Sequence, residues 1–123
     1  MQETEADARL TRIYALLRDW GAKAGFCGFL YVSYVLLQAL QNPSRLDRLT
    51  EELYPETARR YHVAPDDVRR GVRRVIASIW KKNAPRLREL SQEPLGASLS
   101  EKRFFSLACA YLQEAEYFNP HNN

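Results

Sequence analysis

The stretch FCGFLYVSYVLLQAL, residues 26–40, is the most apolar part of this 123-residue chain, and only Gly28, Ser33 and Gln38 interrupt it. Its 15 residues fall short of the ~20 that a bilayer-spanning helix needs. An apolar run of this kind, without the alternation of a half-buried strand, predicts a helix that other helices surround on most sides. We therefore expect an all-α fold in which this helix is the most buried element.

Working outward from this helix, apolar positions recur with helical spacing, and glycine and proline separate the segments. We expect helices at 4–19, 26–41, 45–61, 65–82, 84–90 and 100–117, with a loop at 92–99 and a frayed tail at 119–123. Pro55 should break the third helix near Tyr54, because proline removes a helical hydrogen bond and clashes with the preceding turn. The prediction is one domain over residues 1–123, a six-helix bundle with a helix-turn-helix at about 45–82.

Basic residues are concentrated between Arg59 and Arg88. This segment contains ten basic and two acidic residues, so it carries +8, whereas the whole chain carries +3 and the remainder therefore −5. A charge asymmetry of this size is typical of a surface that binds a polyanion.

The segment from Pro65 to Lys82 divides into an apolar and a basic face on a helical wheel. Five apolar residues lie within about 100° of one another: Val68, Val72, Val75, Ile76 and Ile79. Basic residues lie on the opposite side or at its margins: Arg70, Arg74 and Lys81 opposite, Arg73 beside them, and Arg69 at the edge of the stripe. The arginines repel one another, and no glutamate on this face relieves them. Gly71 costs about 1 kcal/mol inside a helix, which we attribute to a close packing contact.

A helix, a three-residue turn at 62–64 and this basic helix together predict a helix-turn-helix, whose second helix enters the major groove of double-stranded DNA. The candidate DNA-binding residues are Arg69, Arg70, Arg73, Arg74, Lys81, Lys82, Arg59 and Arg60. The planar fork of arginine matches guanine O6 and N7, whereas lysine neutralises phosphates. We expect Arg70, in the first half of the helix, to read a base, and Lys81 and Lys82 to hold phosphates.

Catalytic and metal sites find little support in the sequence. His62 and His121 stand in a turn and in the tail, without a nucleophile at a recognisable spacing, and a metal site needs three or four converging ligands. Cys27 and Cys109 have apolar neighbours, so we expect two buried free thiols in a reducing compartment. The N-terminus is acidic, unlike a signal peptide. The prediction is a cytoplasmic protein that is not an enzyme, has no cofactor or metal and does not associate with a membrane.

Three groups of residues carry a resemblance to a known family: Gly28-Phe29-Leu30-Tyr31-Val32, then Leu53-Tyr54-Pro55 with Ala58, then Val68, Arg70, Arg73, Ile76 and Trp80. Over residues 10–112 the chain resembles the C-terminal effector domain of the response regulator that initiates sporulation in endospore-forming bacteria. The resemblance implies a six-helix bundle whose helix-turn-helix reads a short promoter box, commonly as tandem copies.

The same resemblance implies contact with RNA polymerase through residues 83–95, although these residues match the family poorly. Arg70 matches a position that looks base-reading, and Arg73 also matches. Arg69 and Arg74 stand where the family usually has an acidic residue and a histidine, a difference that bears on the preferred DNA sequence. The family's receiver domain, with its phosphoaccepting aspartate, is not seen, which leaves an excised domain or a stand-alone paralogue.

Two other functions compete with DNA binding. A protein-interaction module could present the same arginines to an acidic surface of a regulator or of RNA polymerase. RNA binding ranks third, because it usually relies on exposed aromatic side chains for base stacking. In the basic segment only Tyr61 and Trp80 are aromatic.

Overall fold

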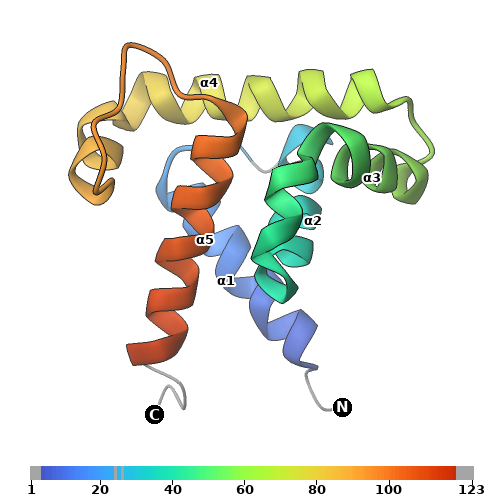
Figure 1. Ribbon diagram of the computed structural model, residues 1–123, viewed down its shortest axis with the longest axis horizontal. Helices are drawn as coiled ribbons and strands as arrows, with labels where there is room; N and C mark the ends of the chain where they lie inside the picture. Colours follow the sequence, from blue (N-terminus) through green and yellow to red (C-terminus); the bar gives the residue numbers. More distant parts are fainter. Residues whose placement is uncertain (1–3, 24, 26, 119–123) are drawn as a thin grey trace.

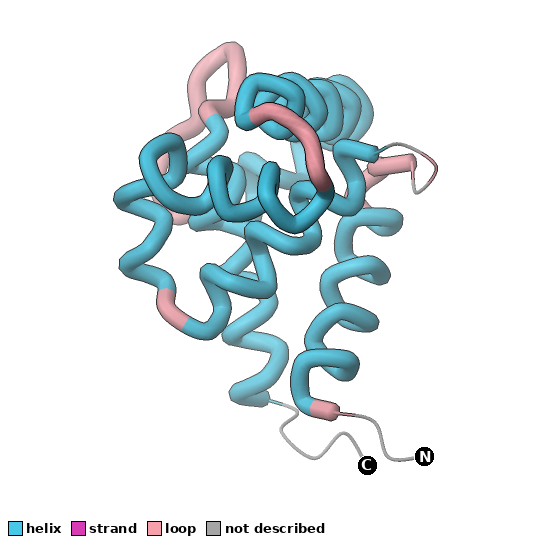
Figure 2. The backbone as a smooth tube through the Cα atoms, turned by 90° about the vertical axis from the view of Figure 1, so that its right-hand side faces the viewer, coloured by secondary structure: helices cyan, strands magenta, loops and turns pink. Residues whose placement is uncertain are grey.

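The computed structural model describes residues 4–23, 25 and 27–118, and over this part of the chain it is helical without any strand (Figures 1 and 2). The helices are α1 (Glu5–Asp19), α2 (Cys27–Gln41), the 3-10 helix η1 (Pro43–Arg48), the π-helical turn η2 (Leu49–Leu53), α3 (Tyr54–Tyr61), α4 (Pro65–Leu90) and α5 (Glu101–Phe118). The predicted all-α class is confirmed, and so is the loop at 92–99. The expectations for Phe26 and for the tail at 119–123 lie outside the described residues.

The expected count of six helices is not confirmed, because the described residues form five α-helices. The segments predicted at 65–82 and 84–90 are one element, α4, with a kink at Asn83 (φ −135°, ψ 25°). Pro85 explains the kink, since proline cannot donate a helical hydrogen bond and restricts the backbone that precedes it. The side-chain amide of Asn83 donates to the Trp20 carbonyl at the end of α1, which fixes the bend.

The segment predicted as one interrupted helix at 45–61 is divided among η1, η2 and α3. The predicted break near Tyr54 is confirmed, since α3 begins there with Pro55 in its first turn. His62 ends α3 in the left-handed conformation (φ 57°, ψ 46°). Only the three residues 62–64 connect α3 to α4.

Side-chain caps define where two of the helices begin. The Thr4 hydroxyl accepts from the Asp7 amide at 3.0 Å before α1. Before α4, the Ala64 amide donates to Asp67 Oδ2 at 3.1 Å, and Pro65 occupies the first turn. A carboxylate at this end also complements the helix dipole. The turn at 62–64 therefore leads directly into α4.

The core is organised around α2, as the sequence predicts. Nine of its 15 residues are buried, and Val32, Val35 and Leu36 are completely so. Helices α1, α4 and α5 all pack on it, with α4 lying across one end of the molecule and the start of α1 and the end of α5 at the other (Figure 1). At that far end, Glu116 of α5 pairs with Arg9 and Arg12 of α1.

Two glycines bring the backbones of α2 and α4 into contact. A Cβ added to Gly28 would lie 2.3 Å from the Gly71 carbonyl oxygen and 2.8 Å from its carbon. A Cβ added to Gly71 would lie 2.9 Å from Tyr31 Cδ2 and 3.1 Å from Gly28 Cα. The close contact predicted for Gly71 is confirmed, and its partner is the glycine of the central helix.

The prediction that both cysteines are buried is wrong for Cys27. Cys109 is buried in α5, but Cys27 is exposed. Cys27 is the first residue of α2, and its apolar sequence neighbours say nothing about the side on which its own side chain lies. Burial raises the pKa of the Cys109 thiol to about 12.

We predict that Gly28→Ala destabilises the fold by about 1–3 kcal/mol, because a backbone atom rather than a movable side chain blocks the added methyl group. Denaturant unfolding measures this free energy. Gly96→Ala is the matched control, since nothing lies within 4 Å of a Cβ at that position. A Gly28→Ala chain as stable as the control variant would contradict the contact.

We also predict that the two thiols differ in reactivity. In the folded chain, a thiol reagent at neutral pH should label Cys27 rapidly and Cys109 only at the rate of unfolding, because Cys109 is both inaccessible and protonated. Mass spectrometry of the labelled chain with and without denaturant separates the two sites. Equal labelling rates under native conditions would refute the burial of Cys109.

Candidate nucleic-acid interface

Helix α4 is anchored on the core by the apolar stripe that the sequence predicts. Val68, Val72 and Ile79 are completely buried, and Val75 and Ile76 nearly so. Trp80 borders the core, as expected: its ring is half-buried against the cluster, its Nε1–H donates to the Ala97 carbonyl at 2.9 Å, and the Arg88 guanidinium lies 4.9 Å above it. The rotation of α4 about its own axis is therefore fixed by packing.

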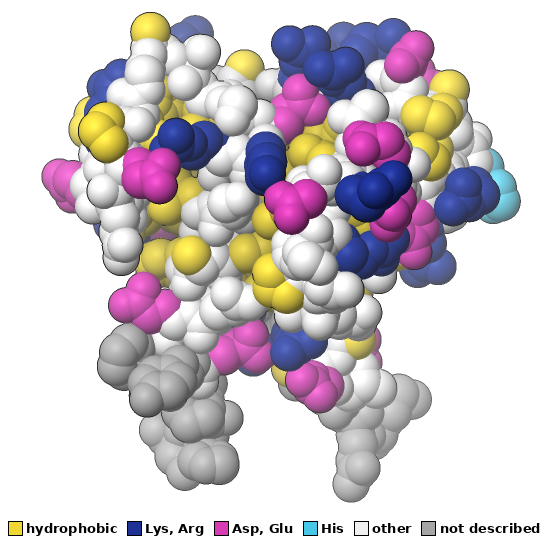
Figure 3. All heavy atoms as spheres, viewed as in Figure 1, with side chains coloured by type: hydrophobic (Ala, Val, Ile, Leu, Met, Phe, Trp, Pro, Cys, Tyr) yellow, Lys and Arg dark blue, Asp and Glu magenta, His cyan; other side chains and the backbone are white. Residues whose placement is uncertain are grey.

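The opposite face of α4 exposes a row of basic side chains. The side chains of Arg70 and Arg73 are 66% and 65% exposed, and Arg74 and Lys81 are exposed as well. Lys and Arg side chains gather along this edge of the molecule, with carboxylates among them (Figure 3). Ala77 is exposed between Arg73 and Lys81, and its short side chain projects little from this face of the helix. We call Arg70, Arg73, Arg74 and Lys81 the basic row.

The expectation that no glutamate relieves these arginines is wrong, and an aspartate also pairs with one of them. Asp67 pairs with Arg70 across one turn, while its second oxygen caps the helix. Glu101 reaches the same face from α5, with Oε2 3.5 Å from Arg69 Nε and 3.6 Å from Arg73 Nε. Glu101 was missed because it lies 28 residues beyond Arg73 in the chain, and a single-helix wheel shows no residue of another helix.

The other predicted site residues are not members of the basic row. Lys82 points to the α1–α2 connection, where its Nζ donates to the Gly21 carbonyl at 3.2 Å. Arg59 and Arg60 are exposed in the last turn of α3. The Arg60 guanidinium lies 5.9 Å from the centre of the Tyr34 ring. Of the eight predicted residues, Arg70, Arg73, Arg74 and Lys81 thus form one face, and Arg69 borders it.

A pocket of 540 Å³ adjoins one flank of the basic row, between the start of α2 and α4. Lys23, Cys27, Arg70 and Arg74 contribute to its wall. The local charge is mainly positive, with Asp67 as the acidic residue in the lining. The flank of the row that faces α2 is therefore hollow and mainly cationic, whereas Glu101 is part of the lining on the opposite flank.

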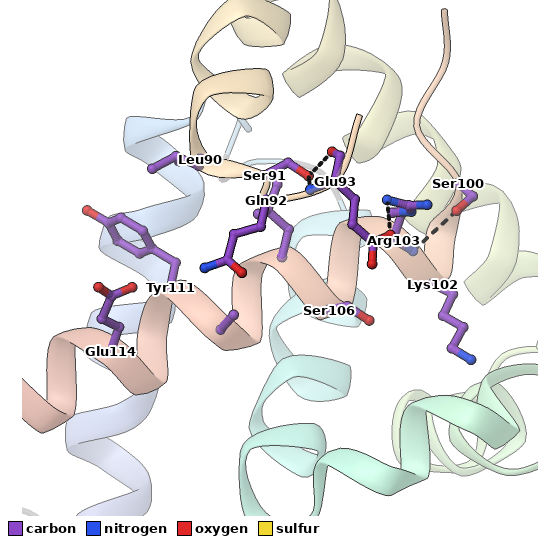
Figure 4. Close-up of a pocket in the computed structure, with 12 residues that line it drawn as sticks. Leu90, Ser91, Gln92, Glu93, Ser100, Lys102, Arg103, Ser106, Tyr111 and Glu114 are labelled. Atoms are coloured by element: carbon purple, nitrogen blue, oxygen red, sulfur yellow. Dashed lines mark hydrogen bonds and ion pairs between the residues drawn. The ribbon is translucent and has the colours of Figure 1, made fainter. Parts of the chain in front are cut away.

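A second pocket, of 690 Å³, lies apart from the basic row, between α5 and the loop that follows α4 (Figure 4). An ion pair between Arg103 and Glu93, at 3.0 Å, fixes the loop against α5. The Ser91 hydroxyl donates to the Glu93 carbonyl at 2.6 Å, which closes the turn. The lining of this pocket has two basic and two acidic side chains, whereas the lining of the first pocket is mainly basic.

Neither pocket points to a metal centre or a membrane segment. Among residues 4–23, 25 and 27–118, no group of three or more His, Cys, Asp and Glu side chains could hold a metal ion. Within the same residues, no helix combines the length and the apolar character needed to cross a membrane.

An anchored helix that exposes a basic row, reached through a short helix and a three-residue connection, defines a helical effector domain suited to contact DNA. Residues 13–103, which are 91 of the 123, match the family described as sporulation initiation factor Spo0A C terminal. The chain belongs to this family, whose members are DNA-binding effector domains of a regulator of transcription in sporulation. The predicted resemblance is thereby confirmed.

Proposed function

We propose that this chain is a sequence-specific DNA-binding regulator of transcription. In this proposal residues 45–82 work as a helix-turn-helix, and the helix over 65–82 enters the major groove. The observation that carries the proposal is the basic row, which is exposed on a helix whose opposite stripe is fully buried. A helix held in this way presents its side chains to a groove without rearrangement of the core.

Arg70 is the proposed base-reading residue. It lies in the second turn of α4, and the first half of a recognition helix enters the groove most deeply. Its present partner, Asp67, is a surface carboxylate, and such pairs contribute only about 0–1 kcal/mol. The guanidinium can therefore exchange Asp67 for guanine O6 and N7 at little energetic cost.

Four of the remaining basic residues are proposed to contact phosphates: Lys81, Lys82, Arg59 and Arg60. Lys81 lies near the far end of the basic row, where a recognition helix leaves the groove and the sugar–phosphate backbone is the nearest anion. Lys82, Arg59 and Arg60 flank the row and would reach neighbouring phosphates. Arg69, Arg73 and Arg74 border or belong to the reading face, and they are assigned to DNA without a choice between base and phosphate.

We also propose that RNA polymerase contacts the face of the second pocket, formed by the loop after α4 and by α5. The family resemblance assigns polymerase contact to residues 83–95, and this region lies apart from the basic row. A chain bound to DNA through α4 would leave this face accessible.

Binding of two copies in tandem is proposed on the same family resemblance. The stoichiometry of the chain on a duplex with two promoter boxes measures it.

We predict that Arg70→Ala and Lys81→Ala affect DNA binding differently. After a selection from genomic fragments, each variant is titrated with the selected duplex and with a scrambled duplex at one salt concentration. Arg70→Ala should lose about 1–3 kcal/mol on the selected duplex and relax the preference at one base pair, whereas Lys81→Ala should weaken both duplexes equally. Arg12→Ala, in the middle of α1, is the control for removal of one positive charge. An equal loss on both duplexes for Arg70→Ala would contradict base reading.

We further predict a steep dependence of DNA affinity on salt. If the four proposed phosphate-contacting residues and one or two of the unassigned arginines meet phosphates, the slope of log K against log salt should be about −5, from counterion release. Lys81→Ala should make this slope shallower by about one unit. A flat salt response, or no binding to any duplex, would favour the protein-interaction module over a DNA-binding domain.

A further inference from the structure

Glu101 connects three helices at one edge of the basic row. It is the first residue of α5, and the preceding Ser100 accepts from the Arg103 amide at 3.2 Å, which caps the helix. One carboxylate oxygen, Oε1, accepts from the Tyr54 hydroxyl of α3 at 2.5 Å. The other, Oε2, faces Arg69 and Arg73 of α4. The side chain is only 17% exposed, in contrast to the arginines it meets.

The hydrogen bond from Tyr54 holds the carboxylate in a fixed position. Tyr54 is almost completely buried. Burial raises the pKa of its hydroxyl well above the ordinary range, and the bond to Glu101 adds to this. The hydroxyl therefore remains a donor at any physiological pH, and Glu101 keeps one oxygen for it. The second oxygen is therefore held in a fixed position beside the two arginines.

The contacts to Arg69 and Arg73 use the Nε side of each guanidinium. Arginine has five N–H donors in a planar fork, so the terminal nitrogens retain their donors for another partner. A long side chain that is ordered on binding loses conformational freedom, which opposes binding. A carboxylate that orders both arginines beforehand removes part of this loss.

We propose that Glu101 is a positioning residue for DNA recognition, which holds Arg69 and Arg73 by their Nε groups so that their terminal nitrogens face the groove. This inference rests on the proposed function. The negative charge of Glu101 has a second effect, because it weakens binding of the same face to phosphates of any sequence. Specificity gains from a repulsive element as well as from attractive ones. Glu101 thus raises the ratio of specific to non-specific affinity.

The test compares Glu101→Gln with Glu114→Gln. Glutamine keeps an acceptor for the Tyr54 hydroxyl but removes the charge, and Glu114 is an exposed residue of the same helix, so both variants change the net charge equally. For Glu101→Gln we expect the affinity ratio between selected and scrambled duplexes to fall about tenfold, the effect of losing one well-placed contact. Binding to the scrambled duplex should tighten. Glu114→Gln should keep the wild-type ratio, with thermal melting showing that both variants are folded.

A double-mutant cycle and a measurement without DNA separate positioning from a general effect. In a chain that already has Arg69→Ala and Arg73→Ala, Glu101→Gln should no longer change the affinity ratio between the two duplexes, because the two arginines that Glu101 positions are absent. In the free protein, NMR should show the Nε–H proton of Arg69, which donates to Glu101, exchanging with water faster in Glu101→Gln than in Glu114→Gln. Unchanged exchange overturns the restraint by Glu101.

The outcomes also separate this inference from the proposed function. If the wild-type chain discriminates between the duplexes and Glu101→Gln discriminates equally well, the positioning role is overturned while the proposed function stands. If the wild-type chain shows no preference for any duplex, the proposed function is overturned and this inference with it.

Discussion

The contact between Gly28 and Gly71 fixes the relation between the core and the candidate interface. Because neither residue has a side chain, the backbones of α2 and α4 touch directly, and the space for a methyl group at Gly28 is filled by the Gly71 carbonyl. Helix α2 is the centre of the core. The face of α4 that lies against it is thereby determined, and so is the face that points outward with Arg70, Arg73, Arg74 and Lys81.

The stability of α4 and the arrangement of its charges have different sources. Burial of a valine or isoleucine side chain contributes about 1.5–3 kcal/mol, and the apolar stripe from Val68 to Ile79 supplies several such residues. Exposed ion pairs such as that of Arg70 with Asp67 contribute about 0–1 kcal/mol each. The exposed ion pairs beside the basic row therefore add little to stability, and their effect is on where the arginines lie and on how much net charge the face presents.

Sequence reasoning located the elements that depend on local signals. The apolar run at 26–40 predicted the central helix, Pro65 predicted the start of α4, and Pro55 predicted the break at Tyr54. Helical periodicity also separated the buried stripe of α4 from its basic face. Each of these features is encoded within one or two turns of helix, so one stretch of sequence suffices.

Features that depend on tertiary contact were not accessible in this way. Glu101 meets Arg69 and Arg73 only because α5 packs beside α4. Lys82, unlike Lys81, donates to the Gly21 carbonyl of the α1–α2 connection. No local pattern of residues predicts the π-helical turn at Leu49–Leu53. Cys27 has apolar neighbours in the sequence, but its own side chain is exposed at the start of α2. At Asn83, Pro85 produces a kink in α4 rather than a helix end, and the contact with Trp20 holds the bend.

The central claim, that the outward face of α4 reads DNA, is tested most directly by a structure of the chain bound to its selected duplex. Our account predicts that the helix over 65–82 lies in the major groove, with the Arg70 guanidinium on a base edge and Lys81 at a phosphate. A complex in which the basic row faces solvent, while the duplex lies against α5 and the loop after α4, would contradict it.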